Sequence, residues 1–170
     1  SEFLKRHLQD KGDHARTLLI DLWGSATMRT AGEEFSMALC LMGVSPTWVD
    51  GSDKVSGIEV ITIPELNRPR VDVTLRVSGL FRDIFPSLTQ LYDQVTNILS
   101  KRYEYPEDNP FVNNTDIARI YGPKSGNYGL RMSSNIKEYT KDNRENYGED
   151  WIESSAWSIV GNKSTYNRKG

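Results

Sequence analysis

Residues 70 to 86 read RVDVTLRVSGLFRDIFP, and the two halves of this stretch follow different hydrophobic periods. Up to residue 77, valine and leucine alternate with polar residues, which is the two-residue period of a strand with one wet face. After Gly79 the apolar positions change to helical spacing, and Pro86 interrupts them. Proline lacks a backbone N–H, so it kinks this helix or begins a second one. The stretch therefore predicts a strand that turns through a glycine into a helix.

The segments around this stretch predict further strands and a buried helix. Residues 17–22 form a short apolar run, which we interpret as a strand buried on both faces. Thr30 and Glu33 have capping-box spacing, which places the start of an almost wholly apolar helix at Thr30, and Gly43 is its expected C-terminal cap. We expect further strands at 45–50, 58–63 and 117–121, an irregular connection at 64–70 and a helix around 151–160.

This order of elements favours an α/β fold: a layered, mainly parallel sheet flanked by helices, Rossmann-like, with a polar C-terminal extension. We divide the chain into a flexible start at 1–15, an α/β core at 16–102, a linker or long loop at 103–116, and a final part at 117–170. The final part holds a strand and a mostly polar helical tail. Such a tail is expected to dock on other parts of a longer subunit, because it is too polar to fold alone.

Charge and composition exclude two classes of partner. The 170 residues carry a formal net charge of -2, so the basic surface of a nucleic-acid-binding protein is not expected. The longest apolar run, residues 37–44, is far shorter than the ~20 residues of a membrane-spanning helix. A single cysteine, Cys40, cannot form an intramolecular disulfide, and we read it as a small core residue. We therefore expect a cytoplasmic protein that binds neither membrane nor nucleic acid.

Two strand-to-helix junctions carry polar side chains where α/β sheets bind ligands, outside the carboxyl ends of their strands. The first junction, residues 24–33, offers serine, threonine and arginine, and the second offers Arg76, Ser78 and Arg82. Both suit carboxylates or phosphates, although neither contains a nucleotide-binding glycine motif. The alternative is that charges of the second junction pair among themselves and tie the helix to the strand. The residues of that alternative are Asp72, Arg76, Arg82 and Asp83.

Three blocks, LWGSATMRTAGEE, RPRVDVTLRVSGLFRDIFP and ARIYGPKSGNYG, occur along the chain in this order. Together they resemble the large, tetrapyrrole-binding subunit of aerobic cobaltochelatase, the CobN type, and more distantly the H subunit of magnesium chelatase. The middle block is long and specific. MRTAGEE and SGLFRDIFP are more similar to the cobalt branch than to the magnesium branch, whereas NYGLRMSSN departs from the glycine-rich continuation expected of the family.

The resemblance implies part of an ATP-dependent ligase that forms nitrogen–metal bonds in cobalamin biosynthesis. Such an enzyme inserts cobalt(II), its substrate metal, into the corrinoid hydrogenobyrinic acid a,c-diamide. An AAA+ ATPase subunit and its companion subunit are the implied partners, and they hydrolyse ATP with Mg. Because family members are many times longer than this chain, a segment of this size is not expected to catalyse the reaction alone.

The matching blocks imply which residues lie near the tetrapyrrole or the metal, but they assign no catalytic residue and no metal ligand. The candidates are Arg76, Ser78, Arg82 and Asp83, followed by Glu33 and Glu34. The two glutamates are also explained as capping and dipole partners of a helix start. Three alternatives stay open: a magnesium chelatase H-type or other tetrapyrrole- or haem-handling subunit, a non-catalytic interaction scaffold, and an independent α/β anion-binding module.

Overall fold

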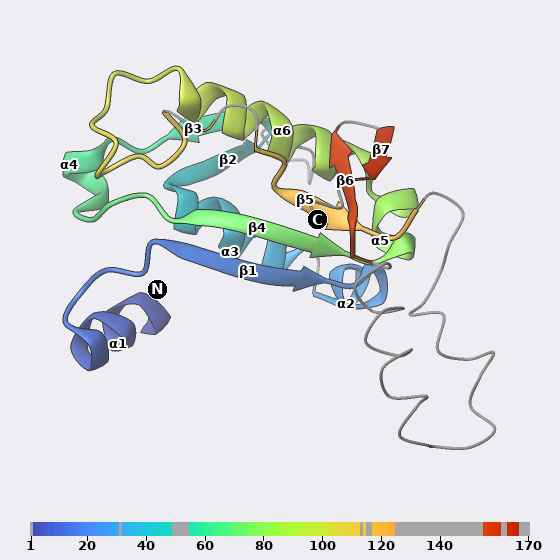
Figure 1. Cartoon of the computed structure of the whole chain (residues 1–170), viewed down its shortest axis with the longest axis horizontal. Coiled ribbons are helices and arrows are strands. Elements are labelled where there is room, and N and C mark those ends of the chain that lie inside the picture. The colour runs from blue at the N-terminus through green and yellow to red at the C-terminus, as the bar shows by residue number, and fades with distance from the viewer. Residues whose placement is uncertain are drawn as a thin grey trace.

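A computed structural model describes residues 2–30, 32–48, 55–112, 114, 117–124, 155–160 and 163–166 (Figure 1). The described residues form a mixed five-stranded sheet of order β1-β4-β5-β6-β7. Its strands are β1 (Thr17–Leu22), β4 (Asp72–Val77), β5 (Ile120–Gly122), β6 (Trp157–Val160) and β7 (Lys163–Tyr166). The first three in the order are parallel, and β6 and β7 are antiparallel to their neighbours. The predicted α/β class, with parallel strands at the centre of the fold and helices beside them, is confirmed.

The two faces of the sheet differ in burial. In β4 the apolar residues are buried and alternate with half-buried polar residues, as the sequence predicts. In β1 only Ile20 and Leu22 are buried, whereas Leu19 is 58% exposed. The prediction that β1 is buried on both faces is therefore wrong. Its physical reason is that β1 is an edge strand, and Leu19 lies on the face opposite that of the buried core residues.

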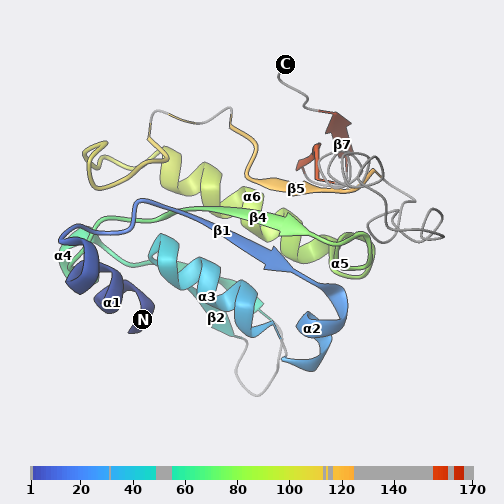
Figure 2. The same ribbon diagram turned by 60° about the horizontal axis from the view of Figure 1, so that its bottom comes forward.

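Two long helices pack on the buried face of the sheet. These are α3 (Glu33–Met42) and α6 (Pro86–Ser100), which run alongside β1 and β4 in Figure 2. Phe35 of α3 meets Tyr92 of α6 edge to face, with 6.2 Å between the ring centroids. The Tyr92 hydroxyl donates a hydrogen bond to the Val73 carbonyl of β4, and burial raises the pKa of this phenol. The core therefore lies between β4 and this helix pair.

The start of α3 differs from the prediction. An unpredicted helix, α2 (Gly24–Arg29), precedes it, and α3 begins at Glu33 after Gly32, whose φ is 82°. The expected capping box is wrong, because the Thr30 hydroxyl donates instead to the Ala26 carbonyl and to the Glu34 carboxylate. Residues 24–29 are already helical, so Thr30 ends one helix instead of beginning the next.

The remaining described elements are three helices and a two-stranded hairpin. Helix α5 (Gly79–Ile84) follows β4, and Pro86 begins α6, so the second of the two outcomes expected at this proline is the correct one. A hairpin, β2 (Val44–Trp48) and β3 (Val55–Val60), follows α3, and α1 (Glu2–Lys11) opens the chain. The expected irregular connection contains a short helix, α4 (Ile63–Leu66). No helix among the described residues is long and apolar enough to cross a membrane.

Two segments that look polar in the sequence contribute to the folded body. In the predicted loop, Asn109 and Phe111 are fully buried. In the tail, residues 157–160 form β6, so the expected helix around 151–160 is wrong there, and residues 151–154 lie outside the described residues. In β6, Trp157 lies opposite Gly122 of β5, so pairing with a distant strand decides the structure of this segment.

Candidate ligand site at the carboxyl ends of β1 and β4

The two predicted junctions lie side by side, because β1 and β4 are parallel and in register up to Leu22 and Val77. Their backbones meet at Ser78, whose N–H donates to the Leu22 carbonyl (2.9 Å). The Ser78 hydroxyl accepts from the N–H of Phe81 (3.1 Å) and from the N–H of Gly24 (3.2 Å). One serine therefore caps α5 and also holds the start of α2, a use of the N-cap position that serine favours.

Gly24 makes this close meeting of the junctions possible. A Cβ atom at this position would lie 2.8 Å from Leu80 Cγ and 2.9 Å from the backbone nitrogen of Phe81. Any larger residue would push α2 away from α5. Sequence reasoning placed Gly24 in the first junction but gave no sign that it touches the second.

Arg76 lies on the sheet face opposite the core, beside the junctions. Its Nε is 2.9 Å from Asp21 Oδ1, and the two side chains are 16% and 48% exposed. They face each other across β1 and β4 in the register, and Tyr121 of β5 is the neighbour of Arg76 on its other side. Sequence reasoning did not identify Asp21 as a site residue. The only indication in the sequence is that Asp21 is the polar residue of a predicted apolar strand.

The contacts of Arg82 and Asp83 stabilise the fold. Arg82 Nε is 2.7 Å from Asp83 Oδ1, and a second nitrogen of this buried guanidinium donates to the Pro123 carbonyl just after β5. Asp72 pairs outside the junction, with Arg119 at 2.7 Å. The predicted tie of helix to strand is therefore not formed among these four charges: Arg82 pairs with its neighbour Asp83 on α5, Asp72 pairs with Arg119 just before β5, and Arg76 pairs with Asp21 of β1.

Glu33 and Glu34 begin α3, where the first junction ends. Glu33 is exposed, and Glu34 accepts a 2.7 Å hydrogen bond from the Thr30 hydroxyl, which lowers the pKa of this carboxyl. Cys40, on the same helix, is exposed, so the expectation of a core cysteine is wrong. Among the described residues, no group of three or more histidine, cysteine, aspartate or glutamate side chains is arranged to hold a metal ion.

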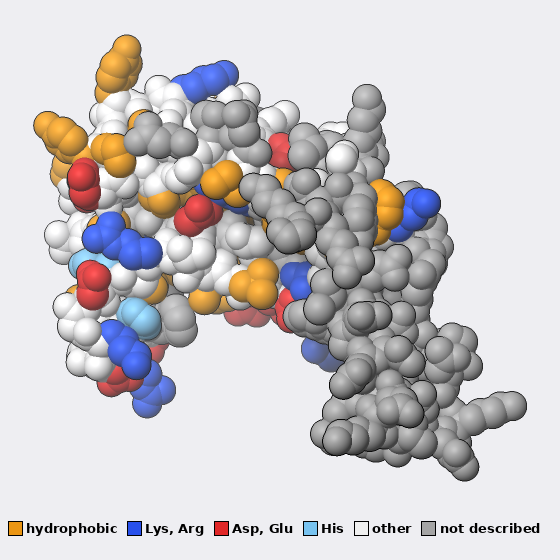
Figure 3. All heavy atoms as spheres, in the orientation of Figure 1, with side chains coloured by type: hydrophobic (Ala, Val, Ile, Leu, Met, Phe, Trp, Pro, Cys, Tyr) orange, Lys and Arg blue, Asp and Glu red, His pale blue; other side chains and the backbone are white. Residues whose placement is uncertain are grey.

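Large apolar side chains are exposed at both junctions, next to these charges. Leu80 and Ile84 lie one turn apart on α5. Trp23 directly precedes α2, and Met28 lies within it. Their exposed fractions are 46% for Trp23, 55% for Met28, 39% for Leu80 and 45% for Ile84. Figure 3 shows one face of the molecule, on which hydrophobic and charged side chains of the described residues are interspersed. Apolar surface beside an arginine suits a flat ligand with an acidic rim.

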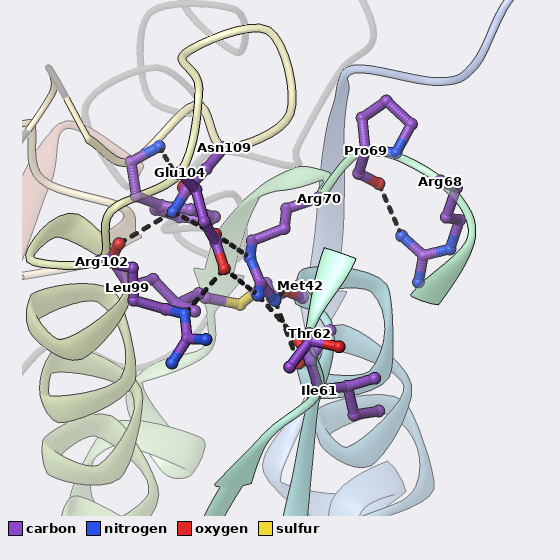
Figure 4. Close-up of polar contacts among 12 residues, drawn as sticks. Met42, Ile61, Thr62, Arg68, Pro69, Arg70, Leu99, Arg102, Glu104 and Asn109 are labelled. Atoms are coloured by element: carbon purple, nitrogen blue, oxygen red, sulfur yellow. Dashed lines mark hydrogen bonds and ion pairs between the residues drawn. The ribbon is translucent and has the colours of Figure 1, made fainter. Parts of the chain in front are cut away.

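A second polar cluster lies at the opposite end of β4, around Arg70 (Figure 4). The Arg70 side chain is fully buried and bonds Glu104 through two nitrogens, at 2.8 Å each. It also donates to the carbonyls of Met42 (2.9 Å), Gly43 (3.1 Å) and Ile61 (2.7 Å). The neighbouring Arg68 donates to the carbonyls of Cys40 and Leu41, so two arginines together satisfy the carbonyl end of α3.

Glu104 balances this buried charge. Burial by itself would raise the pKa of its carboxyl, but hydrogen bonds from Arg70 and Arg102 and the charges of both outweigh burial and lower the pKa to about 2. Asn109 donates to the same carboxylate at 2.8 Å. Because the groups of the cluster bond one another, we interpret it as structural. Sequence reasoning missed this cluster because its members are far apart along the chain.

Comparisons with known proteins identify the family of this chain. The family model described as CobN/Magnesium Chelatase matches residues 1–168. The chain is 38% identical over 169 residues to the aerobic cobaltochelatase subunit CobN of Pseudomonas aeruginosa, covering 88% of this chain and 14% of that protein. It is 30% identical over 133 residues to the magnesium-chelatase subunit ChlH of Oryza sativa subsp. japonica, covering 77% of this chain and 9% of that protein.

A solved structure is similar along nearly the whole chain. The catalytic subunit of cobaltochelatase from Mycobacterium tuberculosis matches with a TM-score of 0.82 and 28% identity, over 97% of this chain and 15% of that one. The chain thus spans a small part of the length of its relatives. The predicted resemblance is confirmed, and this chain belongs to the CobN/magnesium chelatase family.

Proposed function

We propose that this chain is a segment of the tetrapyrrole-binding large subunit of an ATP-dependent cobaltochelatase. The complete enzyme would insert cobalt(II), as substrate, into hydrogenobyrinic acid a,c-diamide during cobalamin biosynthesis in the cytoplasm. Family membership supports the chelatase assignment, and the higher identity to the cobalt subunit named above than to the magnesium subunit favours cobalt. The segment alone would not catalyse insertion.

The observation that carries this proposal is the pairing of Arg76 with Asp21 on two strands whose carboxyl ends carry exposed apolar side chains. A corrinoid is a broad apolar ring whose edge bears carboxylates and amides. A guanidinium forms strong charge-assisted hydrogen bonds with carboxylates, and Trp23 and Leu80 offer apolar surface for the ring. In this arrangement Arg76 binds the rim of the macrocycle, and Ser78 holds the junction on which the macrocycle rests.

The remaining candidates take supporting roles. Arg82 and Asp83 fix α5 against the end of β5, and the exposed part of Asp83 faces solvent near the junction. Glu33 and Glu34 supply negative charge at the start of α3, where they can attract the substrate cation. ATP and Mg would act on the partner subunits, an AAA+ ATPase and its companion, since neither junction has a nucleotide-binding glycine motif.

A second candidate is a magnesium chelatase H-type role. The identity to the rice subunit, which extends over most of this chain, favours it. A porphyrin instead of a corrinoid would then rest on the same junctions. A third candidate is a scaffold that binds only partner subunits. It is favoured because the Arg82 guanidinium pairs with Asp83 within the protein.

The test is a titration of tryptophan fluorescence with hydrogenobyrinic acid a,c-diamide, run beside a porphyrin. We expect saturable quenching by the corrinoid, a smaller response in Trp23→Phe, and weaker binding in Arg76→Gln. Arg6→Gln, an exposed arginine on α1, is the matched control and should bind normally. Quenching by the porphyrin alone would favour the magnesium role. Binding of partner subunits without either macrocycle would favour the scaffold.

A further inference from the structure

The third parallel strand, β5, ends at the same edge of the sheet as the two junctions. Strands β1, β4 and β5 run in one direction, towards the side of the molecule where α2 and α5 follow (Figure 1). We predicted ligand-binding junctions after β1 and β4 but none after β5, which ends at Gly122 and is followed by Pro123 and Lys124. Open α/β sheets bind ligands outside the carboxyl ends of their strands. Lys124 therefore lies at the edge where such sheets bind ligands.

The backbone just before Lys124 is held in place by its neighbours. Gly122 packs closely on the end of β4, where a Cβ atom on this glycine would lie 2.7 Å from the Val77 carbonyl oxygen. Pro123 is buried, and its carbonyl accepts a hydrogen bond from the buried guanidinium of Arg82 on α5. The chain therefore leaves β5 beside α5, and the Lys124 side chain starts from a fixed backbone position.

The Lys124 side chain lies over an aromatic ring, and it has no acidic partner among the described residues. Its Nζ is 5.3 Å from the centroid of the Trp157 ring. Lys124 is exposed, and none of the ion pairs formed by the described residues includes it. A cation over an aromatic face is attracted by the ring, and its ammonium group still has N–H groups to donate. Lys124 is thus an exposed and positioned cation that can donate to a ligand.

We propose that Lys124 is a further ligand-binding residue of this site, and that its ammonium group binds a second carboxylate of the tetrapyrrole rim. The inference rests on the proposed function, in which Arg76 binds one carboxylate of that rim. Arg76 shares its charge with Asp21, so a second ligand carboxylate requires another cation. The ligand class is then narrowed to tetrapyrroles that carry at least two free carboxylates.

Two other arginines near this edge are less suited to the role than Lys124. Arg82 is buried, and its guanidinium is paired with Asp83. Arg29, at the end of α2, is exposed but lies near the Glu34 carboxylate, whose negative charge would repel a second carboxylate. Lys124 meets a carboxylate of the ligand without first giving up a carboxylate of the described residues.

The test compares an acidic and a neutral form of one ligand. Hydrogenobyrinic acid a,c-diamide keeps free carboxylates, and the same macrocycle with every carboxylate converted to an amide is the neutral probe. Dissociation constants for both forms come from tryptophan fluorescence, in variants that keep all four tryptophans.

We expect Lys124→Gln to weaken binding of the acidic form about tenfold, the lower end for a hydrogen bond between charged groups, because Lys124 is exposed. Binding of the neutral form should not change. Lys124→Arg keeps the positive charge and should bind the acidic form nearly as the unchanged chain does. Lys5→Gln, at an exposed lysine of α1, is the matched control and should bind both forms normally.

The outcomes separate this inference from the proposed function. If the unchanged chain binds neither form, both fail together. If it binds the acidic form, and Arg76→Gln weakens that binding while Lys124→Gln does not, only the role of Lys124 is overturned. An equal loss for the acidic and neutral forms in Lys124→Gln also overturns it, because the lysine then meets no carboxylate. Circular dichroism verifies that the variants are folded, as expected for a change at an exposed position.

Discussion

An arginine lies near each end of β4, Arg70 just before the strand and Arg76 within it, and the two make different contacts. At the amino end, Arg70 is fully buried and donates to one carboxylate and three carbonyls. At the carboxyl end, Arg76 lies on the face opposite the core, and its partner Asp21 has a side chain that is 48% exposed. A buried cation must have its donors satisfied within the protein, whereas a cation near solvent can exchange one partner for a ligand. The comparison contrasts a structural arginine with the arginine that we propose binds the ligand.

The largest effect is expected from breaking the buried end. Glu104→Gln leaves the charge of Arg70 without its carboxylate, so we expect the free energy of unfolding to fall by about 3–5 kcal/mol in urea denaturation. Glu107→Gln, an exposed neighbour in the same loop, is the control and should cost less than about 0.5 kcal/mol. A similar small loss in both variants would show that the cluster does not hold the fold.

Acid should weaken the same cluster in the unchanged chain. The pKa of Glu104 is lowered to about 2 in the folded protein from its ordinary value of 4.5. A lowered carboxyl pKa stabilises the fold above the unfolded-state pKa, and this contribution is lost as pH falls from about 5 towards 2. It amounts to about 3 kcal/mol at most. Urea midpoints measured across this range should fall more steeply for the unchanged chain than for Glu104→Gln, and parallel curves would contradict the assignment.

At the carboxyl end of β4, we expect the free energy of unfolding to depend more on the packing of the two junctions than on their charges. Gly24→Ala places a Cβ atom 2.8 Å from Leu80 Cγ, so α2 and α5 must separate. We expect a loss of about 1–3 kcal/mol in the free energy of unfolding. Ser25→Ala, at the next, exposed position, should change it little. Equal stability of the two variants would mean that the junctions are not rigidly joined.

The smallest change in stability is expected for Arg76→Gln. Its ion pair with a half-exposed aspartate contributes about 0–1 kcal/mol. The same substitution should weaken corrinoid binding by about 1.5–3 kcal/mol, roughly ten- to a hundredfold in dissociation constant, because a charge-assisted bond to a carboxylate is lost. Paired melting and fluorescence titrations measure the two effects. A variant that melts early and binds normally would make Arg76 structural, like Arg70.

Local patterns could be predicted where the interactions that decide them are also local. The alternation through β4 predicts which of its faces is buried, and Pro86 marks a helix start because its fixed φ and missing N–H apply in any context. Ser78 was placed correctly at the junction, because the alternation of the strand ends at the residue before it. The capping-box spacing occurs at Thr30 and again at Thr62, but only the second forms a capping box. A residue with capping-box spacing can instead end a preceding helix, as Thr30 does, and sequence spacing alone does not distinguish the two outcomes.

The sequence by itself determined the family, the α/β class and the residues that gather at the strand-to-helix junctions. Three long sequence blocks in the order typical of the family, together with the hydrophobic periods, can be recognised without knowing any contact. The tertiary structure decided the partners of the charges: Asp21 for Arg76, Glu104 for Arg70, and Pro123 for Arg82. It also decided that β6 is a strand and that β1 is an edge. These features depend on which distant segments meet, and a guanidinium or a backbone N–H bonds whichever acceptor the fold brings within reach.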